Sequence, residues 1–128
     1  IELRFHEGFS ADLEQKMANN EIGVAVMHEP TPRDDIQIKE LLVEHLCLIG
    51  KQGTLTKPDY SFAEAASYPL VMPSRPNFLR ILVDSYAEEY DVSLNIVTRS
   101  EGIGHTKSLV RYGPGFTILT YGAVISDV

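Results

Sequence analysis

The hydrophobic pattern of the first 27 residues predicts two strands separated by one helix. Residues 1–6 alternate apolar and polar side chains, and residues 22–27 form a continuous apolar run typical of a strand buried on both faces. Between them, Ser10 is a candidate N-cap for a helix whose narrow apolar stripe contains Leu13 and Met17. The first block therefore has the order of a βαβ unit.

The second half of the chain repeats this order of elements. A short apolar run at residues 70–72 lies between two prolines and predicts a buried strand. Residues 77–90 carry apolar side chains on one helical face, and residues 94–98 predict the next strand. A shorter helix at residues 106–112 and a final strand at residues 116–120 follow. The pattern as a whole indicates an α/β protein.

The segment between the two blocks is less regular. Residues 36–49 fit either two extended segments or one long bent strand. Residues 50–59 are polar and rich in turn formers, which predicts a loop, and residues 62–66 fit a short helical turn.

The turn between the strand at residues 70–72 and the long helix is the main candidate for binding. Ser74 and Asn77 are good N-cap types, and Pro76 suits a first helical position because it has no N–H to leave unpaired. A helix N-terminus at the carboxyl end of a strand offers backbone N–H groups and partial positive charge to a small anion. Alternatively, Ser74 and Asn77 only cap the helix.

Composition limits the possible partners of the chain. Its 128 residues fit one domain, and 18 acidic against 11 basic residues give a net charge of −7. Without a Lys/Arg cluster, such a chain is a poor nucleic-acid binder by itself. Cys47, the single cysteine, is expected to be a small core residue, and the lack of an intrachain disulfide fits a reducing compartment. No apolar run approaches the ~20 residues that span a bilayer.

No constellation of side chains predicts catalysis, a metal or a cofactor. The four histidines are far apart in the sequence and lack metal-ligand spacing. Ser10, Ser74 and Thr120 have no evident base beside them, and no glycine loop for phosphate is present. The sequence therefore favours a binding module over an enzyme.

Four stretches, taken together and in order, resemble the effector-binding domain of LysR-type transcriptional regulators. The resemblance spans nearly the whole chain. The stretches are IELRFHEG at residues 1–8, followed by Ser10 and Leu13; ELLVEHLCLI at 40–49; PLVMPSR at 69–75; and SLVRYGPGFTIL at 108–119. Two positions depart from the family pattern: Gly23 stands where the family usually has Asp, and Thr120 where it often has Pro.

The resemblance implies a type II periplasmic-binding-protein-like fold, in which two α/β subdomains flank an effector cleft. Residues 1–49 would be part of the first subdomain and residues 50–128 the second. The family's domain has further elements before residue 1 and after about residue 128, so the chain is expected to be a middle portion. DNA would be contacted only through an N-terminal helix-turn-helix domain, which is expected to be missing from this middle portion.

The resemblance also implies site residues and partners. Phe9 and Ser10 would contact a small-molecule effector from the first subdomain, and Pro76, Asn77 and Phe78 from the second. Small carboxylates and aromatic acids are common effectors in the family. A cytoplasmic homodimer or homotetramer without a membrane contact is expected, with residues 40–48 as one pairing edge.

Two other functions fit the same fold. The first is a free-standing solute-binding protein, which a helix-turn-helix segment upstream in the gene would exclude. The second is an enzyme, which needs an acid, a base or a nucleophile in the cleft.

Overall fold

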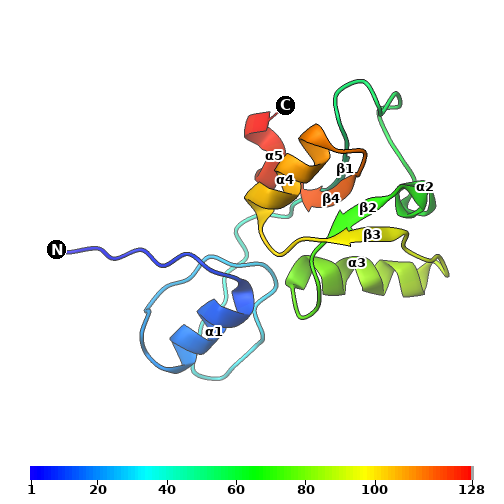
Figure 1. The fold of residues 1–128 in the computed structure, drawn as a ribbon. Helices are drawn as coiled ribbons and strands as arrows, with labels where there is room; N and C mark the ends of the chain where they lie inside the picture. The colour runs from blue at the N-terminus through cyan, green and yellow to red at the C-terminus, as the bar shows by residue number, and fades with distance from the viewer. Residues whose placement is uncertain (128) are drawn as a thin grey trace. The chain divides into compact units, whose positions relative to one another are not determined.

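The computed structural model describes residues 1–127, which form two compact units, Ile1–Leu42 and residues 43–127 (Figure 1). The first unit has little regular structure and the second is a mixed α/β unit. None of the helices in residues 1–127 combines the length and the apolar character needed to cross a membrane.

The first unit contains one helix, α1 (Ser10–Ala18). Asp12 in its first turn and Lys16 in its last turn have the charges that the helix dipole favours. The Glu14 carboxylate accepts the backbone N–H of Thr31 at 2.8 Å, which ties the following loop to the helix.

The strands predicted at residues 1–6 and 22–27 do not form, so the predicted βαβ unit is absent from the structure. Val24 and Val26 are 87% and 74% exposed, whereas the pattern predicted burial on both faces. A strand needs a hydrogen-bonding neighbour, and neither segment has one among the described residues. An apolar run alone therefore did not make these segments strands.

The second unit is built on four short strands. β1 (Leu46–Ile49) pairs antiparallel with β4 (Thr117–Thr120), and β2 (Leu70–Met72) pairs parallel with β3 (Ile96–Arg99). A parallel bridge between Leu70 and Phe116 joins the two pairs. Of the predicted segment at residues 36–49, only the β1 end is a strand.

Helices connect these strands. They are α2 (Phe62–Ser67), α3 (Phe78–Glu89), α4 (Ile103–Tyr112), α5 (Tyr121–Val124) and the 3₁₀ turn η1 (Ile125–Asp127). The core contains Leu70 and Met72 of β2, Val83 of α3 and Ile118 of β4, each at most 3% exposed. The predictions of a buried strand at residues 70–72, a following amphipathic helix and a final strand are thus confirmed. Cys47 is only half-buried, and burial raises the pKa of its thiol.

Candidate functional site

Three strands of the second unit end at the same edge. β2, β3 and β4 run parallel, so their carboxyl ends lie together, and α3, α4 and α5 begin just after them. We call the residues that follow these strands, 73–77, 100–102 and 120–122, the carboxyl edge. In open α/β sheets ligands bind at this kind of edge.

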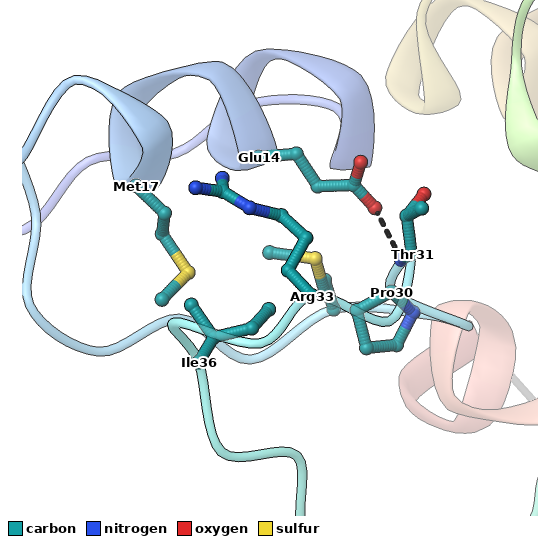
Figure 2. Close-up of a pocket in the computed structure, with 7 residues that line it drawn as sticks. Glu14, Met17, Pro30, Thr31, Arg33 and Ile36 are labelled. Carbon is teal, nitrogen blue, oxygen red and sulfur yellow. Dashed lines mark hydrogen bonds between the residues drawn. The ribbon is translucent and has the colours of Figure 1, made fainter.

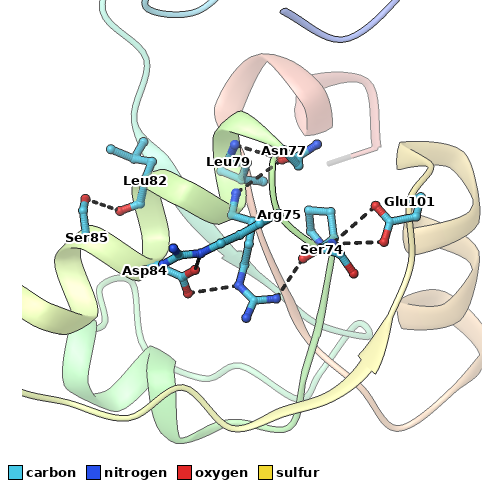
Figure 3. Close-up of polar contacts among 10 residues, drawn as sticks. Ser74, Arg75, Asn77, Leu79, Leu82, Asp84, Ser85 and Glu101 are labelled. Atoms are coloured by element: carbon cyan, nitrogen blue, oxygen red, sulfur yellow. Dashed lines mark hydrogen bonds and ion pairs between the residues drawn. The ribbon is translucent and has the colours of Figure 1, made fainter. Parts of the chain in front are cut away.

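Asn77 caps α3 at the carboxyl edge. Its side-chain Oδ1 accepts the backbone N–H groups of Leu79 at 2.9 Å and Arg80 at 3.3 Å (Figure 3). The expected capping role of Asn77 is confirmed, and two of the helix's first N–H groups are already bonded. Pro76 is not the first helical residue as predicted, because the helix begins at Phe78 and Pro76 precedes the cap after a cis peptide bond.

Ion pairs hold this turn on α3. The Asp84 carboxylate accepts a hydrogen bond from Arg75 Nε at 2.7 Å (Figure 3). It also accepts one from Arg80 Nε at 3.0 Å, and Arg80 Nη1 donates to the Pro73 carbonyl at 3.0 Å. Burial alone would raise the pKa of Asp84, but the two guanidinium groups outweigh it and lower that pKa. Two cations therefore share the Asp84 carboxylate.

The backbone N–H at the start of the turn is hydrogen-bonded to a carboxylate. The Ser74 N–H donates to both oxygens of Glu101, with N–O distances of 3.0 and 3.3 Å (Figure 3). Ser74 therefore does not cap α3, because Asn77 does so and the Ser74 amide binds the β3–α4 loop instead. In that same loop, the hydroxyl of buried Ser100 lies 3.5 Å from His105 Nδ1.

In the first unit, Phe9 is the N-cap of α1 and Ser10 is its first helical residue. Ser10 is therefore not the N-cap that the sequence predicted, because Phe9 already has the extended backbone of a cap. The Phe9 side chain is half-exposed and cannot cap. Within residues 1–127 the Ser10 hydroxyl makes no hydrogen bond.

A small hollow lies beside α1, and none of the predicted site residues lines it. It is lined by Glu14 and Met17 of the helix and by residues of the loop that follows, among them Pro30, Thr31, Arg33 and Ile36 (Figure 2). Its volume is about 20 Å³. Pockets for small molecules measure roughly 300–1,000 Å³, so this hollow holds little more than one water molecule.

The structure places the five predicted site residues in two groups. Pro76, Asn77 and Phe78 lie together at the start of α3, and Phe9 and Ser10 lie at the start of α1 in the other unit. No group of His, Cys, Asp or Glu within residues 1–127 is arranged to hold a metal ion. Sequence reasoning missed Glu101, which reaches Ser74 from 27 residues away.

Comparison with known proteins identifies the family. The family model described as the LysR substrate binding domain matches residues 1–128. This chain belongs to that family. The HTH-type transcriptional regulator BbuR of Bordetella bronchiseptica is 31% identical over 130 residues, covering 100% of this chain and 40% of that protein. The nitrogen assimilation regulatory protein Nac of Escherichia coli is 25% identical over 126 residues, covering 98% and 41%.

These matches confirm the LysR-type resemblance. The LysR-family homologues are regulators of transcription and not enzymes. The chain spans about two-fifths of the length of these curated relatives. The mixed α/β architecture of the second unit agrees with a portion of a LysR substrate-binding domain.

Proposed function

We propose that this chain senses a small anionic effector, such as a carboxylate, as part of a LysR-type DNA-binding transcriptional regulator. The observation that carries the proposal is the family match over all 128 residues. In the complete protein, two α/β subdomains of the type II periplasmic-binding-protein kind would flank an effector cleft. Residues 1–49 would contribute to the first subdomain and residues 50–128 to the second.

The proposed effector contacts come from the starts of two helices. On the α1 side, Ser10 offers a hydroxyl without a protein partner and the first N–H groups of a helix that no side chain caps. Phe9 would supply an apolar wall beside it, as most ligand pockets have. Pro76, Asn77 and Phe78 would supply the contacts on the α3 side.

Two cationic side chains at the turn support an anionic effector. Arg75 and Arg80 share the Asp84 carboxylate, so the second positive charge is balanced only by the exposed Glu101 carboxylate at the Ser74 N–H. The chain as a whole carries a charge of −7, so this attraction is local. For the complete protein, we propose DNA and a second copy of the regulator as partners. We propose the cytoplasm as its location.

A melting screen tests the proposal. The chain is heated with a panel of small carboxylic and aromatic acids at constant ionic strength, with the matching uncharged amides as controls. A ligand that binds only the folded chain at 100 times its Kd adds about 2.7 kcal/mol to the free energy of unfolding. We expect at least one acid to raise Tm while its amide does not. If the amides raise Tm as much as their acids, the proposed anionic class is wrong.

A further inference from the structure

The Ser74 amide is a backbone donor that already holds a carboxylate. Ser74 is half-buried at the end of β2, and its N–H lies within hydrogen-bond distance of both Glu101 oxygens. Farther along the turn, the Asn77 N–H donates to the Ser74 carbonyl at 3.2 Å, and Asn77 Oδ1 accepts the N–H groups of Leu79 and Arg80 in α3. Glu101 thus fills the position at the Ser74 N–H that an external carboxylate would otherwise take.

Charge favours a carboxylate at this position. The Arg75 and Arg80 guanidinium groups are paired with one carboxylate between them, and Glu101 forms no ion pair with any side chain of residues 1–127. Glu101 itself is exposed, so it can turn into water without losing a buried contact. Exposed charged contacts contribute little net stability, so little is lost when Glu101 leaves the Ser74 N–H.

We propose that Ser74 and the surrounding carboxyl edge form a carboxylate-binding subsite that the chain fills with its own Glu101 side chain. The effector's carboxylate binds by exchanging with Glu101 at the Ser74 N–H. Glu101 is therefore a specificity-determining residue, because only a ligand that competes with a tethered carboxylate enters. This inference rests on the proposed function and adds Ser74 and Glu101 to its site.

The exchange predicts that removing the resident carboxylate opens the amide to external anions. A group tethered by a short linker competes at an effective concentration in the millimolar range. The Glu101→Ala variant should therefore bind a simple carboxylate at the Ser74 amide more tightly than the unaltered chain, by a factor of one plus the ratio of amide-bound to released Glu101. Acetate is the probe, and the Ser74 signal in ¹⁵N–¹H NMR spectra is the readout, at constant ionic strength.

Controls separate exchange from a general charge effect. Glu88→Ala removes another exposed carboxylate, on α3, and should leave the Ser74 response to acetate unchanged. Where Glu101→Ala lowers Tm, Glu101→Gln replaces it, since the Gln side chain can still accept the Ser74 N–H without its charge. It should give an intermediate gain in acetate affinity.

Two results would overturn the subsite: a Ser74 signal in Glu101→Ala that does not respond to acetate, or one that responds equally in both chains. These failures differ from failure of the proposed function. If acids raise Tm in the melting screen but the Ser74 NMR signal does not respond to acetate, only the subsite is wrong. If no acid raises Tm but the Ser74 signal of Glu101→Ala responds to acetate, only the proposed function is wrong.

Discussion

The Glu44 carboxylate accepts the backbone N–H of Gly122 at 2.9 Å, joining residues 78 positions apart. The bond lies just beyond the last pair of the β1–β4 ladder, Leu46 with Thr120, and beside the hydrogen bond from Tyr121 N–H to the His45 carbonyl. It therefore fastens the segment entering the first strand of the second unit to the segment leaving its last strand.

Gly122→Ala should destabilise the chain by about 1 kcal/mol, the usual net value of one hydrogen bond. A Cβ atom at position 122 would overlap the Glu44 carboxylate, so that carboxylate must move away from the amide. Urea unfolding measures the change. In a Glu44→Ala background the same substitution should cost nothing further, because the overlap is gone. Equal losses in both backgrounds would contradict this account.

Gly104→Ala is the matched glycine control. Gly104 lies inside α4 and its added Cβ would meet no atom within 4 Å. Replacing glycine by alanine in a helix is worth roughly 0.5–1 kcal/mol. This variant should therefore unfold at a higher urea concentration, in the opposite direction from Gly122→Ala.

Asn77→Ala should lower the free energy of unfolding by about 1 kcal/mol, the typical cost of a lost N-cap. The Leu79 and Arg80 N–H groups would lose their acceptor. Asn77→Asp keeps a side-chain oxygen at the helix start and should retain most of the stability. Thermal melting of the two variants checks this, and an equal loss in both would show that capping is not the main role of Asn77.

Glu64 should make stability depend on pH in the acid range. Its carboxylate accepts hydrogen bonds from Lys57 and from the Ser61 N–H, which lower its pKa from 4.5 to about 2. Since the folded pKa is the lower one, the contribution is fully present above about pH 4.5 and is lost as pH falls towards 2. The Tm difference between the unaltered chain and Glu64→Gln should shrink across that window.

The comparison for Glu64 is Glu88→Gln, which removes an exposed carboxylate from α3 that has no side-chain partner within residues 1–127. Its Tm difference from the unaltered chain should stay nearly constant over the same pH range. A Glu64→Gln difference that is equally constant would mean that the Lys57 and Ser61 contacts do not act on folding.

The apolar residues before β1 should take part in pairing of two chains. Leu41, Leu42 and Val43 are 68%, 69% and 78% exposed, so they are not core residues. We expect light scattering to find dimers at high concentration and Leu42→Glu to reduce them. Val24→Glu changes a comparably exposed side chain elsewhere and should leave pairing unchanged. A strictly monomeric species at high concentration would contradict this prediction.

Local signals in the sequence predicted the second unit well. The apolar run at residues 70–72 became β2, and the cap at Asn77 was recognisable because capping depends on residues only two or three positions apart. The same local rule placed the cap of α1 one residue too late, since Phe9 takes the cap position without a suitable side chain.

Long-range contacts limited the rest of the prediction. The strands expected at residues 1–6 and 22–27 depended on neighbours that the pattern cannot supply. The contact between Glu101 and Ser74 joins two loops through the parallel pairing of β2 with β3. No spacing rule within either loop indicates it, so Glu101 became a candidate only when the strands were placed side by side.

Calorimetric titration of Ser10→Ala tests the central claim, that a small anion binds at the helix starts, most directly. The titrant is the acid that raises Tm most in the screen. The Ser10 hydroxyl has no partner within residues 1–127, so its loss should leave Tm unchanged. A hydrogen bond to a charged group is worth about 1.5–3 kcal/mol, so affinity should fall roughly tenfold or more. Unchanged affinity in Ser10→Ala, with or without a lower Tm, would contradict the assigned site.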